Sequence, residues 1–184
     1  YVSNESGSFA GGTTKGIANL RQRLDDWYEE QSFEERVMEL FSPSHAEQDL
    51  VEGVGSNLGS DSGIDQFVDD IEAEALDHGR VGHAQKAARA NRDADGNVRL
   101  LRRHFESTDD IGSDQNVASL HFPSLQRNIS AFEAVRRAMN GTDMPEVTPA
   151  VRQRVKKGIV EYNFVSRRGY FLVPPRRHGA RPTP

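Results

Sequence analysis

Apolar residues recur with helical spacing near the beginning of the chain. Leu20, Leu24 and Trp27 are separated by the three or four residues that place side chains on one face of a helix. Ser32, followed three residues later by Glu35, has the pattern of a capping box at the start of a second helix. The sequence therefore predicts two helices after an opening that is rich in Gly and Ser.

The second half of the chain has the pattern of strands around an amphipathic helix. Alternation of polar and apolar residues predicts a strand from Val98 to Phe105. Apolar runs predict further strands over Ala118–Phe122, Ile159–Val165 and Tyr170–Val173, the last two joined by a turn at Gly169. Between Phe122 and Ile159, apolar residues repeat on one face of a helix.

The order of these elements predicts an α+β fold. If the Gly-rich opening contains a strand, the order becomes the ferredoxin-like pattern, an antiparallel sheet with helices on one face. The length suits a single domain over residues 1–175, followed by a basic, proline-containing tail at 176–184. A further helix is expected to begin at Thr148. The uncovered face of such a sheet needs a partner domain, a second copy or a flat apolar cofactor.

Residues 42–79 differ from the rest of the chain in charge. They contain ten Asp or Glu and no Lys or Arg, and they are rich in Gly and Ser. Ten like charges without counterions are costly to bury. We therefore expect an acidic surface insertion, mostly loop with one short helix, that lies outside the core.

Composition excludes several classes of function. The absence of cysteine rules out disulfides, thiolate catalysis and cysteine-bound metals, and no apolar run reaches the roughly 18 residues of a membrane helix. Common nucleotide-binding and serine-hydrolase motifs are also absent. The net charge of −5 and the prolines of the basic tail argue against nucleic acid as a partner. Arg outnumbers Lys nineteen to four, which fits a GC-rich genome or a halophilic source.

One of the six histidines, His83, has unusual surroundings. Its segment, Gly82–Ala90, is dominated by alanine, so a flat macrocycle could approach it closely. An imidazole is a common axial ligand of haem iron. The competing interpretation is a helix packed tightly on the sheet, with His83 as an ordinary hydrogen-bonded residue. None of the histidines forms a compact zinc motif.

An arginine and a histidine share one face of the strand that begins at Val98. Side-chain alternation places Arg102 and His104 on the same side. A cation beside an iron-bound peroxide would stabilise charge on the leaving oxygen, and an imidazole could move a proton. The competing interpretation is an edge strand with solvated arginines.

Four short segments together resemble the C-terminal half of dye-decolourising (DyP-type) haem peroxidases. They are Gly82–Asn91, Leu100–Arg103, Ala118–Phe122 and Gln126–Arg127. The Gly-Gly pair and the Leu-to-Trp helix near the beginning of the chain are similar to further parts of that family. A divergent member of archaeal or halophilic origin would match this composition.

The resemblance implies a role for each of several residues. His83 would be the proximal ligand, and hence the metal-binding residue, of haem b, and Arg102 would be the distal arginine. Leu120 and Phe122 would be walls of the haem pocket, and His104 is the nearby group that could serve as acid or base. The fold implied is one ferredoxin-like half of a two-half α+β barrel, completed by an N-terminal half or by a homo-oligomer.

Three departures from the family pattern affect the predicted activity more than the predicted haem binding. The Gly-x-x-Asp-Gly motif, which carries the distal aspartate, is absent. His104 stands where the family has Gly or Asn, and Pro123 is expected to interrupt the wall strand.

Three functions follow from these observations. The first is a peroxidase domain that uses hydrogen peroxide and a small organic reductant. The second is a non-catalytic haem- or iron-handling protein of the iron-uptake type, which the resemblance connects with export through the twin-arginine route. The third is an interaction domain without haem. A chain that is not exported by the twin-arginine route would be cytoplasmic.

Overall fold

The computed structural model describes residues 6–51, 66–109, 117–143 and 156–175, which form two compact units. The sheet unit comprises the described residues up to Gln22, from 92 to 135, and from 164 onward. The helical unit comprises the described residues of 23–91 and 136–163. In the part of the chain that the structure describes, no helix is long and apolar enough to cross a membrane.

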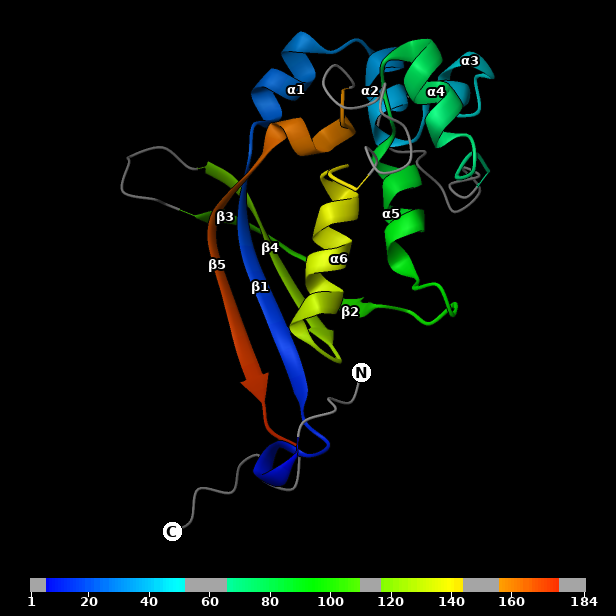
Figure 1. The fold of residues 1–184 in the computed structure, drawn as a ribbon. Helices are drawn as coiled ribbons and strands as arrows, with labels where there is room; N and C mark the ends of the chain where they lie inside the picture. Colours follow the sequence, from blue (N-terminus) through cyan, green and yellow to red (C-terminus); the bar gives the residue numbers. More distant parts are fainter. Residues whose placement is uncertain (1–5, 52–65, 110–116, 144–155, 176–184) are drawn as a thin grey trace. The chain divides into compact units, whose positions relative to one another are not determined.

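The sheet unit is built on a five-stranded antiparallel sheet with the order β2-β4-β1-β5, in which β3 also pairs with β4 (Figure 1). The predicted α+β fold is thereby confirmed. The strands are β1 (Thr13–Gln22), β2 (Leu100–Arg102), β3 (Phe105–Asp109), β4 (Val117–Gln126) and β5 (Asn163–Val173). A short 3-10 helix, η1 (Gly7–Phe9), precedes β1.

Helix α6 (Ile129–Met139) covers one face of this sheet, which we call the helix-side face. A side-chain carbon at Gly16 of β1 would lie 2.8 Å from the ring of Phe132, so this ring packs directly on the strand backbone. The Phe132 ring also meets Tyr170 edge to face, with centroids 5.5 Å apart. The sequence therefore places a glycine where the helix approaches the sheet most closely.

The opposite face of the sheet, the open face, exposes apolar side chains. In the register of the sheet, Leu101 lies opposite Leu125 and Phe105 lies opposite His121. Leu101 and Phe105 are both 54% exposed. This is the face that the sequence predicted would need a covering partner.

Strand β4 continues through Pro123 without interruption, which corrects the prediction from sequence. The neighbouring strand is divided instead. Arg103 donates its N–H to the carbonyl of Pro123 at 3.1 Å, but proline has no N–H to return. β2 and β3 are the two parts of this neighbour, and they keep the same register on β4, so that His104 falls opposite Phe122.

The helical unit contains short helices and two apolar clusters. The helices are α1 (Leu24–Glu30), α2 (Phe33–Leu40), α3 (Pro43–Glu47), α4 (Ile71–His78), α5 (His83–Asn91) and the 3-10 helix η3 (Gly158–Tyr162). The first cluster joins α4 to Val81, and the second joins α2, Val51 and α5. The predicted capping box of α2 is present: Ser32 and Glu35 each accept the backbone N–H of the other.

Three predicted elements differ from the structure. Leu20 lies in β1 and not in a helix, because the small residues that face Phe132 conceal the alternation of this strand. Residues 159–162 form η3 and not a strand. β5 then runs straight through Gly169 as one strand, so no turn divides it. The predicted helix that begins at Thr148 and the tail 176–184 lie outside the described residues.

The prediction that residues 42–79 remain outside the core is wrong for the described part of this segment. His45 is completely buried, Val51 is 4% exposed, and Ala75 is 3% exposed. The number of acidic residues led to a wrong prediction because, on α4, these residues alternate with apolar residues that are buried. One of them, Glu74, is buried and accepts the backbone N–H of Ser44 at 3.0 Å.

Candidate functional site

His83 is the first residue of α5, and a buried network holds the backbone just before it. The N–H of Gly82 donates to the Gln85 side-chain carbonyl at 2.9 Å. The Gln85 amide nitrogen donates to the carbonyl of Phe67 at 2.7 Å and to the Glu74 carboxylate. A side-chain carbon at Gly82 would overlap the carbonyl of Phe41. The first turn of α5 is therefore fixed from several sides.

A second segment also approaches the backbone of His83. Gly158 has φ +63°, and a side-chain carbon there would lie 3.1 Å from the backbone nitrogen of His83 and 2.5 Å from the carbonyl of Glu39. Val81 donates its N–H to the carbonyl of Lys156 at 3.0 Å. The His83 backbone is thus held between α2 and the segment that enters η3, while its side chain is partly exposed.

The side chains that follow His83 on α5 divide into small residues and one buried cation. Ala87, one helical turn after His83, adds almost no bulk on the same side of the helix. Lys86 is fully buried, and its Nζ donates to the carbonyl of Met139 at 3.0 Å and to that of Lys157. Burial, reinforced by the neighbouring Lys157 charge, lowers the pKa of Lys86 to about 7. Lys86 thus serves to hold two carbonyl groups inside the helical unit.

Three of the other predicted site residues share the helix-side face of the sheet unit. Arg102 lies opposite Ser124, next to Gly16 in the same register, and Phe122 lies opposite Ala18. Leu120 follows two residues from Phe122 on the same face, and His104 takes the position opposite Phe122. Arg102 and His104 are exposed, whereas Leu120 and Phe122 are half-buried. The register therefore places Arg102, Leu120 and Phe122 on one face of the sheet, with His104 in the segment between β2 and β3, while His83 belongs to the helical unit.

The described residues contain no group of three or more His, Asp or Glu side chains that could hold a bare metal ion. A single histidine at a rigid helix start, followed by alanine one turn later, suits the axial position of a haem iron. The position of His83 therefore fits that of a protein ligand to haem.

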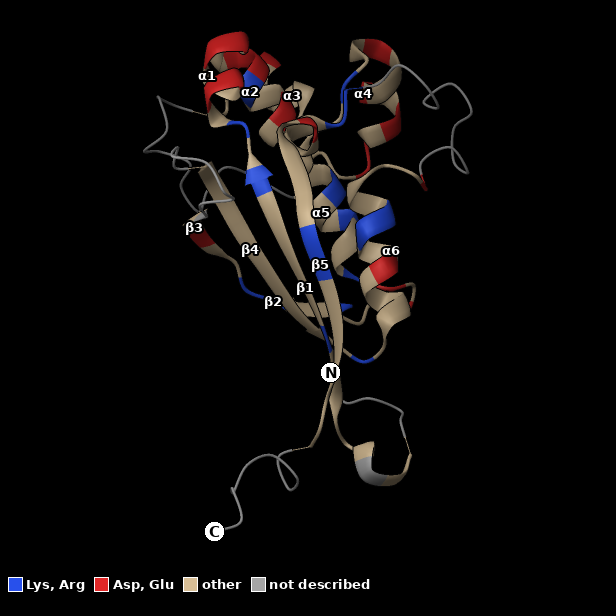
Figure 2. Ribbon diagram, turned by 90° about the vertical axis from the view of Figure 1, so that its left-hand side faces the viewer, with Lys and Arg blue, Asp and Glu red and all other residues tan. Residues whose placement is uncertain are grey.

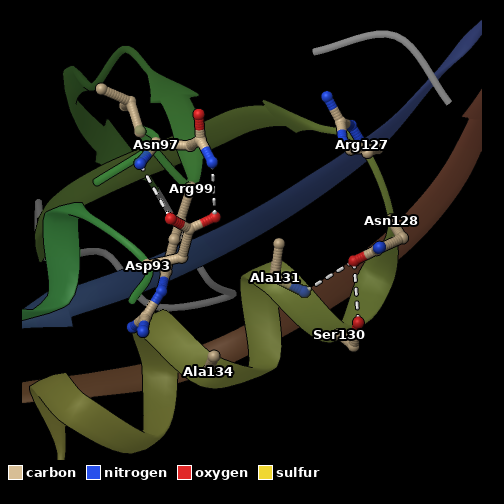
Figure 3. Close-up of a pocket in the computed structure, with 9 residues that line it drawn as sticks. Asp93, Asn97, Arg99, Arg127, Asn128, Ser130, Ala131 and Ala134 are labelled. Atoms are coloured by element: carbon tan, nitrogen blue, oxygen red, sulfur yellow. Dashed lines mark hydrogen bonds between the residues drawn. The ribbon is translucent and has the colours of Figure 1, made fainter. Parts of the chain in front are cut away.

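Sequence reasoning missed a cavity of about 540 Å³ in the sheet unit (Figure 3). Its lining comes from the turn before β2 and from the beginning of α6, which are far apart in the sequence. The only sequence signal was local: Asn128 followed by an amphipathic run is typical of a helix start. Nothing in the pattern indicated that this helix start would meet the turn.

Solved structures with the same fold are DyP-type proteins. A variant of DypB from Rhodococcus jostii RHA1 in complex with haem is 14% identical, with a TM-score of 0.56 over 96% of this chain and 45% of that chain. A DyP-type peroxidase from Cellulomonas bogoriensis is 21% identical, with a TM-score of 0.54 over 95% and 42%. The dye-decolorizing protein from V. cholerae is 15% identical, with a TM-score of 0.50 over 94% and 45%.

These similarities define the class of fold: the chain has the ferredoxin-like architecture of one half of a DyP-type protein, and it spans less than half the length of those structures. Residues 1–175 match the family described as "Family of unknown function (DUF7405)", and the chain belongs to this family. No curated protein matches the chain by sequence.

Proposed function

We propose that this chain is a haem-binding domain of a DyP-like peroxidase, with His83 as the axial ligand of the iron. The observation that carries the proposal is the likeness of the fold, over 96% of the chain, to a DyP-type structure in complex with haem. The location of His83 at a rigid helix start supports it, because an axial ligand must be held in one orientation.

The remaining site residues have roles that follow from their chemistry. Bound haem b would supply the redox chemistry of iron with hydrogen peroxide. The Arg102 guanidinium would stabilise negative charge that develops on a peroxide oxygen. The His104 imidazole would hold or move a proton at its ring nitrogen. Leu120 and Phe122 would exclude water from the helix-side face.

We also propose that a partner domain or a second copy of the chain covers the open face of the sheet. Its exposed apolar residues, among them Leu101, Phe105 and Phe171, are the kind of surface that another domain covers. The solved structures that share the fold are more than twice as long as the matched region. An N-terminal half-domain or a second copy of the chain would therefore complete the functional protein.

Reconstitution with haem b tests the axial ligand. Purified protein is loaded with haem, and the Soret band and the haem stoichiometry are measured for wild type, His83→Ala and the control His104→Ala. We expect His83→Ala to lose the Soret position of the wild type and to recover it when free imidazole is added, while His104→Ala keeps it. An unchanged Soret band and stoichiometry in His83→Ala would exclude His83 as the ligand.

Peroxide-dependent dye oxidation separates the catalytic function from the alternatives. We expect the 184-residue chain to bind haem but to turn over slowly, because the distal carboxylate of the Gly-x-x-Asp-Gly motif is absent from this sequence. Rapid turnover that is lost in His104→Ala would show that His104 replaces this carboxylate. Haem binding without any turnover, even with the partner domain present, would favour the haem- or iron-handling function. Absence of haem binding would favour an interaction domain.

A further inference from the structure

The cavity of the sheet unit combines two cationic side chains with an apolar wall (Figure 3). The cations are Arg99, which is half-buried, and Arg127, which is exposed. The apolar wall is formed by Val98, Ala131 and Ala134. A volume of about 540 Å³ lies in the range of small-molecule sites. The cavity is therefore large enough to take a ligand with both a charged and an apolar part.

The single carboxylate in the lining, Asp93, is committed to its own turn. Its oxygens accept the N–H of Asn97 at 2.8 Å, the N–H of Asp95 at 3.1 Å and the Asn97 side-chain amide at 3.4 Å. The hydrogen bonds from Asn97 are the main reason why the pKa of Asp93 lies below its usual range. Asp93 therefore stays ionised and directed into the turn, and the lining keeps an excess of one positive charge.

The two guanidinium groups differ from those of Arg80 and Arg89 in the helical unit. Arg80 and Arg89 form ion pairs with carboxylates, at 3.1 and 2.8 Å, whereas neither Arg99 nor Arg127 has a hydrogen bond or ion pair with a described residue. Arg99 is attracted to the Asp93 charge but does not bond to it. Both donors remain available for an anion, and guanidinium groups bind carboxylates and related oxyanions through paired hydrogen bonds.

The beginning of α6 supplies the opposite side of the cavity. Figure 3 shows Asp93, Asn97 and Arg99 on one side, and Asn128, Ser130 and Ala131 in the first turn of α6 on the other. Asn128 caps this turn by accepting the N–H of Ala131 at 2.9 Å and the Ser130 hydroxyl at 2.8 Å. The positive end of the helix adds to the field of the arginines. The two arginines and the cavity itself remain the basis of the inference.

We infer that this cavity binds a small organic anion, with its charged group near Arg99 and its apolar body against Ala131 and Ala134, while Arg127 adds positive charge to the lining. All lining residues belong to the sheet unit. The inference is therefore independent of haem and of the proposed peroxidase function, and it can be tested on haem-free protein.

Two probes of nearly equal shape separate charge from apolar contact. The haem-free 184-residue chain is titrated with 2-naphthoate and with the neutral 2-naphthamide in a calorimeter. We expect 2-naphthoate to bind at least about tenfold more tightly at low salt, with a difference that shrinks as salt screens the arginines. Equal affinity for the two probes, or no binding of 2-naphthoate, would overturn the inference.

Variants locate the site. Arg99→Gln combined with Arg127→Gln should weaken 2-naphthoate binding at least about tenfold. Ala134→Leu should weaken it by filling the cavity without a change in charge, which protects the test if Arg99→Gln disturbs the turn. Arg167→Gln on β5 is the matched control and should leave the affinity unchanged. Undiminished binding in both cavity variants, or an equal loss in Arg167→Gln, would overturn the inference.

Competition and NMR complete the assignment. Inorganic phosphate should displace 2-naphthoate only weakly, because phosphate has no apolar body to contact Ala131 and Ala134. If phosphate bound as tightly as 2-naphthoate, the inference that the ligand is an organic anion would be overturned. The amide signals of Ser130 and Ala131 should shift on addition of 2-naphthoate. If these signals do not move while 2-naphthoate binds, the ligand lies elsewhere and the inference is overturned.

Discussion

The two units of the molecule bury different kinds of polar groups. In the sheet unit the buried polar side chains are neutral and small or amidic: Thr14, Ser119, Ser124 and Gln126. In the helical unit they include ionisable groups: Glu39, His45, Glu74 and Lys86. A buried ionisable group couples stability to pH, whereas a buried hydroxyl does not. We therefore expect the helical unit to respond to pH on both the acid and the alkaline side, whereas the sheet unit responds on the acid side through Asp93.

The two units also differ in the numbers of acidic and basic residues that they carry (Figure 2). The described residues of the sheet unit carry nine Lys or Arg and five Asp or Glu, whereas those of the helical unit carry nine and sixteen. α1 alone contributes four carboxylates in seven residues. The helical unit tolerates this acidity because some carboxylates are paired, as Glu39 is with Lys156 at 3.7 Å and with Arg80 at 3.8 Å.

The largest expected effect comes from a glycine of the helical unit. Gly82→Ala would force a side-chain carbon into the carbonyl of Phe41, a backbone atom that cannot move alone. We expect a loss of about 3 kcal/mol in the free energy of unfolding. Gly96→Ala in the sheet unit is the control, since its φ is +80° but open space surrounds it, and the loss there should be about 1 kcal/mol. Chemical denaturation measures both, and equal losses would contradict the prediction.

The second prediction concerns Lys86. Its folded pKa of about 7 lies below the unfolded value of 10.5, so the unfolded chain binds the extra proton between these values. The free energy of unfolding should therefore rise by about 2 kcal/mol from pH 7 to pH 9. Lys86→Met should remove this rise, and Lys15→Met in β1 should keep it. Parallel pH profiles for wild type and Lys86→Met would disprove the assignment.

The third prediction concerns the stability of the helical unit at acid pH. Hydrogen bonds from Ser32, followed by that from Arg80, lower the pKa of Glu35 to about 2. The stabilisation is thus complete above the ordinary pKa of 4.5 and is lost as pH falls from there toward 2. Because Glu35 is partly exposed, Glu35→Gln should cost only about 1 kcal/mol at neutral pH. Thermal unfolding from pH 2 to pH 7 measures this, with Glu34→Gln as a control that should behave like the wild type.

The smallest expected effect lies in the sheet unit. Pro123→Val would provide an N–H opposite the carbonyl of Arg103 and would allow β2 and β3 to pair with β4 continuously. We expect the free energy of unfolding to increase by about 0.5 to 1 kcal/mol, and this increase should not depend on pH. Hydrogen exchange should show protection of the amide introduced at position 123. Rapid exchange at this amide would show that the hydrogen bonding between β4 and the segment joining β2 to β3 is still interrupted.

The elements that the sequence predicted correctly are those with local signals. The capping box of α2 and helix α6 each depend on residues within one or two turns of the chain. The pattern of the sequence did not identify β1 as a strand, because the residues on its helix-side face are small. Their place against the helix is recognised only from the contact of Gly16 with Phe132. η3 was taken for a strand because its β-branched Ile159 and Val160 have strand propensity, which the tertiary structure overrides.

The candidate site was predictable to a similar extent. Alternation predicted the strand position of Arg102, which lies opposite Ser124, because that argument needs only the geometry of one strand. The buried partners of α5 could not be predicted, since Glu74 and Phe67 lie outside the helix and appeared to belong to an acidic surface segment. The cavity was equally hidden, because its arginines come from separate parts of the chain.

The side chain of Gln85 has a consequence for how the chain tolerates changes in sequence. Its amide ties the start of α5 to Phe67 and Glu74, which follow the segment 52–65, while Val51 before that segment is anchored in a core cluster. Both ends of the segment are thus fixed independently of what connects them. A change of sequence within 52–65 should therefore leave His83 where it is, because the contacts that hold the start of α5 come from residues outside that segment.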